Sequence, residues 1–254
     1  MKIFHYYLCR QLKGGGMEIK MKYQAILFDL DGTLLPMDND VFVDEYFKLA
    51  ARKMEPYGYT FEEMVKALWK SAKAMVLNDG SRTNCEACWQ SFTETFGEQG
   101  RELLPVFEAF YQKEFHEAVK VTGENPLARR ALELAREKAE KVILATNPMF
   151  PPVAVQTRLS WVDLKPGDFN YWTHYENSSF CKPNPAYYLE IMKKLGLDAS
   201  KCLMIGNDAQ EDAEAAQSVG MDTFLVTDCL IDRGQAPDGK KGSFAELIAF
   251  LERL

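Results

Sequence analysis

The chain has 254 residues, of which 47% are apolar and 26% are charged, and it carries a formal net charge of −7. These values are typical of a globular protein with a sizeable core, built as one large domain or as a core with a second module. The acidic balance argues against a nucleic-acid partner, since such proteins present a basic face, and no apolar run approaches the roughly 18–20 residues that a membrane helix needs.

The first 20 residues precede the first predicted strand and include a run of three glycines. They contain basic residues but no continuous apolar segment of the kind that a secretory signal peptide requires. We therefore expect a disordered extension, residues 1–20, and a cytoplasmic protein. Six cysteines in a chain without such a signal do not predict a disulfide framework.

The first predicted strand, residues 25–28, is apolar and runs directly into two acids. Asp29 and Asp31 follow it, and the chain then breaks at Gly32 and Thr33. Burying an unpaired carboxylate is costly, so a buried strand that ends in two acids indicates a bound cation or a reaction at this point. The two side chains are two residues apart in extended chain and therefore point the same way.

Residues 40–120 carry apolar side chains at helical spacing in four successive segments with Gly- and Asn-containing joints. We interpret them as a small bundle of amphipathic helices inserted after the first strand. The third segment contains Cys85 and Cys88, half of a zinc or redox pattern. The pair falls on one apolar helical stripe with Trp89 and Phe92, and the sequence has no second such pair, so packing is favoured.

Strand and helix patterns alternate in the rest of the chain. Short apolar runs predict strands at residues 142–145, 202–205 and 224–226, with a weaker one at 169–173. Helical patterns lie at residues 126–138, 152–164, 185–195 and 212–219. This alternation predicts an α/β fold with a doubly wound, Rossmann-like parallel sheet. Ligands of such sheets bind beyond the carboxyl ends of the strands.

Polar side chains follow the predicted strands at this edge. Asp29 and Asp31 are joined there by Thr146 and Asn147 after the second strand, by Asp208 and Asp212 after residues 202–205, and by Lys182 in a loop that opens a helix. Taken singly, these residues suit a turn, a helix cap, a solvated lysine or the helix dipole. Taken together, several carboxylates, a hydroxyl and an ammonium favour a site for a hard cation and a phosphate.

The segments FDLDGT, ATN, CKPNP and GNDAQED resemble the four motifs of the haloacid dehalogenase (HAD) superfamily, whose members are mostly phosphatases. The resemblance runs from about residue 23 to residue 230, and the helical insert matches the all-helical cap that this family places after its first motif. It implies a core formed by residues 21–38 and 121–254 and a cap domain formed by residues 39–120.

The resemblance also implies a role for each motif residue. Asp29 would be the nucleophile that forms an aspartyl-phosphate, and Asp31 the general acid and then the base. Phosphoryl oxygens would be bound by Thr146, Asn147 and Lys182, and Mg²⁺ by Asp29, the backbone carbonyl of Asp31, Asp208 and, directly or through water, Asp212. The fourth motif departs from the common Gly-Asp pattern, because Asn207 stands at a position that is acidic in some relatives.

Three alternatives to a phosphatase follow from the same residues. A dehalogenase needs neither a metal nor an acid for its leaving group, so Asp31 and Asp208 favour phosphate chemistry. A phosphomutase of the β-phosphoglucomutase type would use the same residues. A receiver-like or otherwise non-catalytic phospho-aspartate protein is the third, although receiver domains are about half as long and lack a helical insert.

We expect the substrate to be a small phosphorylated metabolite, with neither nucleic acid nor membrane as a partner. The cap would close over the substrate and exclude water. Arg82 and Asn84, in the loop between two cap helices, are the candidates to reach the crevice from the cap.

Overall fold

The computed structural model describes residues 21–234 and 238–254. Its centre is a six-stranded parallel sheet with the strand order β3-β2-β1-β4-β5-β6. The strands are β1 (Tyr23–Phe28), β2 (Ala139–Leu144), β3 (Tyr171–Trp172), β4 (Cys202–Gly206), β5 (Asp222–Val226) and β6 (Lys240–Gly242). The doubly wound α/β fold predicted from the alternation of strands and helices is thus confirmed.

The register of the central strands brings their carboxyl ends together. Phe28 of β1 lies beside Leu144 of β2 on one side and Ile205 of β4 on the other. These strands are buried on both faces, which explains why they are continuous apolar runs in the sequence. The polar residues that follow β1, β2 and β4 therefore emerge side by side at one edge of the sheet.

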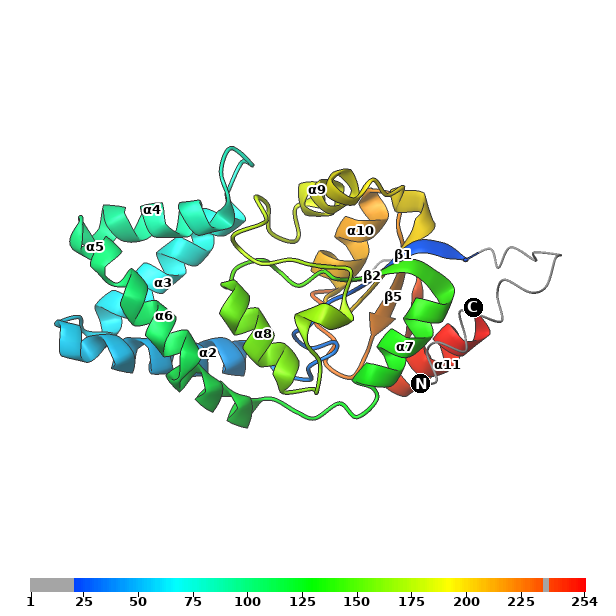
Figure 1. The fold of residues 1–254 in the computed structure, drawn as a ribbon, viewed down its shortest axis with the longest axis horizontal. Coiled ribbons are helices and arrows are strands. Elements are labelled where there is room, and N and C mark those ends of the chain that lie inside the picture. Colours follow the sequence, from blue (N-terminus) through cyan, green and yellow to red (C-terminus); the bar gives the residue numbers. More distant parts are fainter. Residues whose placement is uncertain (1–20, 235–237) are drawn as a thin grey trace, which may run out of the picture.

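Helices cover both faces of the sheet (Figure 1). Alternate side chains of β1 face opposite layers, so Ile26 packs in one hydrophobic cluster and Leu27 in the other. The first cluster includes residues of α7 (Ala128–Lys138), α8 (Pro152–Ser160) and α11 (Phe244–Arg253). The second includes residues of α9 (Pro185–Leu195) and α10 (Ala215–Ser218).

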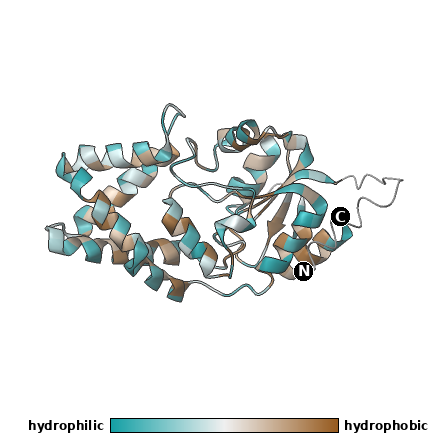
Figure 2. Ribbon diagram, in the orientation of Figure 1, coloured by the Kyte–Doolittle hydropathy of each residue, from teal (hydrophilic) through white to brown (hydrophobic). Residues whose placement is uncertain are grey.

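A helical region follows β1 and lies beyond α8, at the end of the molecule away from α11 (Figure 1). It comprises α2 (Asn39–Met54), α3 (Phe61–Val76), α4 (Asn84–Phe96), α5 (Gln99–Glu102) and α6 (Leu104–Gln112), with 3-10 turns at Glu55–Tyr57 and Glu114–Val121. Hydrophobic and hydrophilic residues alternate along these helices (Figure 2). The family-type helical insertion after the first strand is confirmed, while the division into domains at residues 39 and 120 stays a prediction.

Two capping boxes set the starts of the central helices in this region. The side chains of Thr60 and Thr83 each accept a hydrogen bond from the backbone N–H of the glutamate three residues on. The carboxylate of that glutamate in turn accepts from the backbone N–H of the threonine. Cys85 and Cys88 of α4 are free thiols, and Cys88 packs against the hydrophobic cluster. The interpretation of this Cys-x-x-Cys pair as a packing element agrees with the structure.

Some elements differ from the predictions. The helix predicted over residues 152–164 ends at Ser160, and Asp163 has a left-handed φ of 54°. The helix predicted over residues 212–219 begins earlier, with a π-helical segment at Ala209–Glu214 that continues into α10. Strand β6 and helix α11 were not predicted; β6 is only three residues long and polar, whereas α11 does carry a capping box at Ser243.

The predicted disordered extension, residues 1–20, lies outside the described residues. Among the residues that are described, no helix has the length and apolar content that crossing a membrane requires.

Candidate active site

Asp29 is the first residue beyond β1 and extends the sheet by one hydrogen bond. Its backbone N–H donates to the carbonyl oxygen of Ile205 at 2.9 Å, and its side chain is buried. Nζ of Lys182 donates to Asp29 Oδ1 at 2.8 Å and to Asp212 Oδ1 at 2.6 Å, and only 1% of this lysine is exposed. Two buried carboxylates therefore share one ammonium.

The pKa values of this cluster follow from burial and from the charges of neighbouring side chains. Burial raises the pKa of Asp29 well above its usual value; Lys182 opposes this effect, and the nearby charges of Asp212 and Asp31 add to it. Burial alone would lower the pKa of Lys182, but the attraction of Asp212 and Asp29 outweighs it and raises that pKa. The cluster retains excess negative charge that a further cation or a proton would relieve.

Asp212 organises the loop that follows β4. Its Oδ2 accepts hydrogen bonds from the backbone N–H groups of Asn207 and Asp208, both at 3.0 Å. Gly206 allows this approach, because a Cβ atom there would lie 2.2 Å from the Asp212 carboxylate. With Oδ1 on Lys182 and Oδ2 on two amides, the contacts favour a positioning role for Asp212, and its predicted role as a metal ligand stays a prediction.

Asp31 is paired with an arginine that sequence reasoning did not identify. Its Oδ2 accepts hydrogen bonds from Nη1 of Arg158 and from Oγ1 of Thr146, the latter at 3.4 Å. Arg158 lies on α8, is 1% exposed, and its guanidinium stands 4.4 Å from the ring centre of Phe150. Asp31 Oδ1 and Arg158 Nη2 are both buried without a hydrogen-bond partner among the described residues.

Thr146 and Asn147 lie two and three residues beyond β2 and are held by different contacts. Thr146 is fully buried, and its carbonyl oxygen accepts from Thr173 Oγ1 at 2.7 Å and from the Tyr187 hydroxyl at 2.9 Å. Asn147 Oδ1 accepts from the backbone N–H of Lys182 at 3.3 Å. The threonine thus has its hydroxyl beside Asp31, while the asparagine orients the loop that carries Lys182; phosphoryl binding by both stays a prediction.

Asp208 caps the helix that follows β4 and also pairs with a cation. Its Oδ1 accepts from the backbone N–H groups of Gln210 and Glu211, both at 2.9 Å. Nη1 of Arg233 lies 3.0 and 2.9 Å from its two oxygens, but the arginine side chain is 55% exposed, so this pair is readily exchanged for another cation. Asn207, at the position that departs from the common motif, accepts a hydrogen bond from Thr33 Oγ1 at 2.9 Å.

The donor set at this edge fits a hard cation held by few protein ligands. Among the described residues, no group of three or more His, Cys, Asp or Glu side chains is arranged to hold a metal ion. Mg²⁺ needs less, because it commonly uses one or two carboxylates and keeps several waters. Asp29 and Asp208 supply two carboxylates at this edge, and the surroundings of Asp29 carry negative charge that Lys182 only partly offsets.

Asn84 joins the helical region to the loops that carry the site residues. It is fully buried at the start of α4, and its Nδ2 donates to the carbonyl oxygen of Pro148 at 3.1 Å and to Sγ of Cys181 at 3.3 Å. Pro148 follows Asn147 and Cys181 precedes Lys182. The expectation that Asn84 reaches toward the site from the helical region therefore agrees with its contacts.

Arg82, the other candidate to reach the crevice, points away from the core loops. Its exposed side chain donates to Gln90 of α4, and it lines a surface groove with other residues of α3 and α4. The physical reason is that Asn84, two residues on, occupies the buried position against the core loops, so Arg82 remains on the solvent side of the turn.

A model of the family described as haloacid dehalogenase-like hydrolase matches residues 23–220. Three similar proteins are a phosphorylated carbohydrates phosphatase of Thermotoga maritima, 28% identical over 84% of this chain and 89% of its own; a pyrimidine 5'-nucleotidase of Streptococcus pneumoniae, 29% identical over 80% and 84%; and a phosphoglycolate phosphatase of Vibrio parahaemolyticus, 29% identical over 80% and 83%.

Solved structures show the same fold at lower identity. The magnesium-bound HAD-hydrolase YfnB of Bacillus subtilis superposes with a TM-score of 0.56 at 17% identity, covering 91% of this chain and 99% of that one. A 2-haloacid dehalogenase of Pseudomonas syringae superposes with a TM-score of 0.58 at 20% identity, covering 90% and 99%. These two structures show that the fold is shared. The chemistry has to be argued from the site residues of this chain.

Proposed function

The chain belongs to the haloacid dehalogenase-like hydrolases, and from this premise we propose that it is a Mg²⁺-dependent phosphatase that hydrolyses a small phosphorylated metabolite through an aspartyl-phosphate on Asp29. Support comes from the similar proteins of Thermotoga, Streptococcus and Vibrio, which are phosphatases or a nucleotidase. The observation that carries the proposal is the placement of Asp29 against the Lys182 ammonium, next to the paired Asp31.

Asp29 is the nucleophile in this proposal. Lys182 holds Oδ1, which leaves Oδ2 to attack phosphorus and displace the alcohol. The same ammonium offsets the charge that builds up on the phosphoryl oxygens, and its burial makes that interaction stronger than it would be in water. The Thr146 hydroxyl and the Asn147 amide bind the remaining phosphoryl oxygens.

Asp31 acts as general acid and then as general base. Because Arg158 and Thr146 engage Oδ2, the unpartnered Oδ1 is the atom that carries the proton. In the first step it protonates the leaving alcohol oxygen, and in the second it takes a proton from the water that attacks the aspartyl-phosphate. Each aspartate therefore has one oxygen held and one oxygen available.

Mg²⁺, held by Asp29, Asp208 and the backbone carbonyl of Asp31, would supply positive charge against the phosphoryl group and the nucleophile. Arg233 is paired with Asp208 in this structure, and its exposed side chain would have to leave that carboxylate for the cation to bind there. Asp212 keeps Lys182 and the loop after β4 in place through its contacts to the ammonium and to the backbone N–H of Asn207.

The dehalogenases of this fold do not need the Asp31 arrangement. A halide leaves without a proton, so a buried carboxylate with a dedicated arginine would bring a desolvation cost and no benefit in that reaction. An alkoxide leaving group does need a proton, which favours phosphate ester chemistry for this chain. A phosphomutase would use the same atoms but would return the phosphoryl group to a second hydroxyl of the substrate.

The test is hydrolysis of a panel of phosphorylated metabolites by the purified protein with Mg²⁺ or with EDTA, with Asp29→Asn as the inactive control. Release of inorganic phosphate that requires Mg²⁺ is the expected result. Full activity in EDTA would overturn the metal requirement. Isomerisation of a sugar phosphate without phosphate release would establish the mutase instead.

A further inference from the structure

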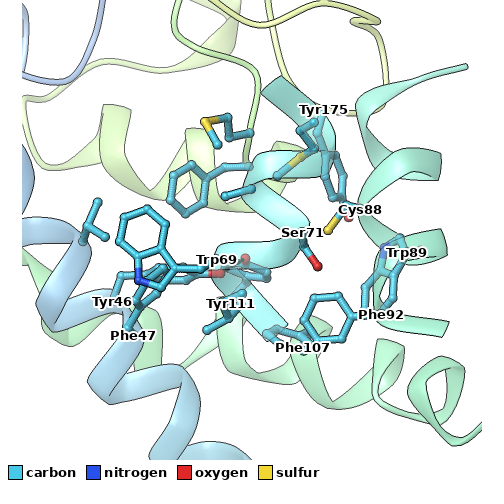
Figure 3. A pocket seen from close by; sticks show the side chains of 16 residues that line it. Tyr46, Phe47, Trp69, Ser71, Cys88, Trp89, Phe92, Phe107, Tyr111 and Tyr175 are labelled. Carbon is cyan, nitrogen blue, oxygen red and sulfur yellow. Dashed lines mark hydrogen bonds between the residues drawn. The ribbon is translucent and has the colours of Figure 1, made fainter. Parts of the chain in front are cut away.

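The helical region holds an apolar cavity of about 230 Å³ where it meets the loop after β2 (Figure 3). Helices α2, α3, α4 and α6 contribute most of its wall, and Phe150 and Tyr175, from the loops after β2 and β3, line the remaining side. The cavity opens partly to solvent beside the exposed Trp69, and it is large enough to admit a small apolar group.

The wall of the cavity offers almost no polar partner. None of the described residues that line it is charged. The hydroxyl groups of Tyr46 and Tyr111 form a hydrogen bond with each other at 2.8 Å. Ser71 is 2% exposed, and its hydroxyl has no hydrogen-bond partner among the described residues. Figure 3 shows it in the midst of the labelled rings. A ligand there would be apolar, with at most one polar group opposite Ser71.

The cavity is linked to Asp31 through two side chains. The Phe150 ring lines the cavity and also stands 4.4 Å from the guanidinium of Arg158, which contacts Asp31. Burial raises the pKa of the cavity residue Tyr46, and the positive charge of Arg158 acts on it in the opposite direction. Two side chains, Phe150 and Arg158, therefore connect an occupant of the cavity with the group that would protonate a leaving alcohol.

We propose that the cavity binds the apolar ring of the substrate's leaving alcohol, so that the preferred substrates are phosphate monoesters of aryl-substituted alcohols. This inference rests on the proposed phosphatase function. A cavity of roughly 150 Å³ is enough to hold benzene, and this one has room for a ring with a short chain. The hydroxyl groups of a sugar would lose their water here and find hardly any partner.

The reaction balances without a further reactant. The phosphorus–oxygen bond to the apolar alcohol breaks as the bond from Asp29 to phosphorus forms, and the alcohol takes the proton of Asp31. Water then hydrolyses the aspartyl-phosphate and restores the proton to Asp31. The products are inorganic phosphate and an alcohol whose ring leaves the cavity.

The experiment compares 3-phenylpropyl phosphate with propyl phosphate, because the two leaving alcohols have similar acidity and differ in the ring. Burial of one ring predicts a kcat/KM at least about 10-fold higher for the phenylpropyl ester. In Ala72→Phe the new ring fills the cavity, and this preference falls to near one. The matched control Ala74→Phe, two residues along α3 and outside the cavity, keeps the preference.

Binding of the product alcohol gives a readout that does not depend on catalysis. We expect 3-phenylpropanol to raise the Tm of the wild type and of Ala74→Phe and to leave that of Ala72→Phe unchanged, with Ser71→Leu as a second filling variant if Ala72→Phe does not fold. Equal kcat/KM for the two esters, or a preference that survives in both filling variants, overturns the inference while phosphatase activity stands. Ring binding without hydrolysis of either ester overturns the inference about the substrate, and the proposed function falls only if the metabolite panel also releases no phosphate.

Discussion

Nη1 of Arg158 donates a hydrogen bond to Oδ2 of Asp31, which lies 127 residues earlier in the chain. The arginine is 1% exposed, and the side chain of the aspartate is 21% exposed. The pair fixes one oxygen of Asp31 and leaves the other unpartnered among the described residues. Because Oδ2 already accepts from the guanidinium, a proton on Asp31 is favoured at Oδ1.

The Arg158–Asp31 pair predicts an effect on stability and on activity. Arg158→Met leaves a mostly buried carboxylate without its cation, so we expect the free energy of unfolding to fall by ~2–4 kcal/mol, measured by urea denaturation. Turnover should fall most for esters with poor leaving groups, which depend on Asp31. Arg130→Met is the control, because the Arg130–Glu252 pair is on the surface and is worth ~1 kcal/mol or less. Equal losses in the two variants would contradict a special role for Arg158.

The two acids of the first motif predict separate defects. Asp29→Asn should form no phosphoenzyme, because a neutral amide is a poor nucleophile. Asp31→Asn should slow the first step by ~10²–10⁴-fold for alkyl esters and by less for aryl esters with good leaving groups. Rapid-quench labelling followed by peptide mapping measures both steps. Label on Asp31, or near wild-type turnover by Asp29→Asn, would reverse the assignment, and a phospho-Asp29 stable for hours would indicate a receiver-like protein.

Substitution of Asp208 should change the metal dependence of the activity and leave the fold intact. Asparagine caps a helix about as well as aspartate, so Asp208→Asn keeps the contacts to the N–H groups of Gln210 and Glu211 and removes only the charge. We expect the Mg²⁺ concentration for half-maximal activity to rise at least 10-fold, with the unfolding free energy within ~1 kcal/mol of wild type. Unchanged Mg²⁺ dependence would remove Asp208 from the metal site.

The raised pKa of Glu211 should make the free energy of unfolding depend on pH in the absence of Mg²⁺. Burial is the main cause that raises its pKa from 4.5 to about 7, with Lys182 opposing. A raised carboxyl pKa means that the folded state binds more protons than the unfolded state between these two values. The unfolding free energy should therefore fall as pH rises from about 4.5 to 7, by ~1–3 kcal/mol because the side chain is partly exposed. Glu211→Gln should flatten this decline in urea titrations made with EDTA.

The contacts of Asn84 predict that the helical region influences catalysis through the core loops. Asn84→Ala leaves the Pro148 carbonyl without its donor, at a cost of ~1–3 kcal/mol, and loosens the loops that carry Asn147 and Lys182. We expect kcat to fall. Thr83→Ala is the matched control, because it removes the cap of α4, at ~1 kcal/mol, without touching those loops. If both variants lower kcat alike, the effect belongs to α4 as a whole.

The sequence by itself determined the sheet and the edge at which the site residues gather. Apolar runs that end in polar residues specify buried parallel strands, and such strands present their carboxyl ends at one edge. Asp29, Thr146 and Asp208 could be placed there because each directly follows a strand, to within two residues. The cap helices were predictable for a related reason, since helical periodicity is a local property of the chain.

Only the tertiary structure decided which of these side chains pair with one another. In the sequence Arg158 is an arginine within a helix, and its burial depends on the packing of α8 against residues more than a hundred positions away. The same holds for Asp212, whose oxygens reach Lys182 and two backbone amides, and for Asn84 on the core loops. Periodicity reports the face on which a residue lies, whereas the partner it meets depends on how distant elements pack together.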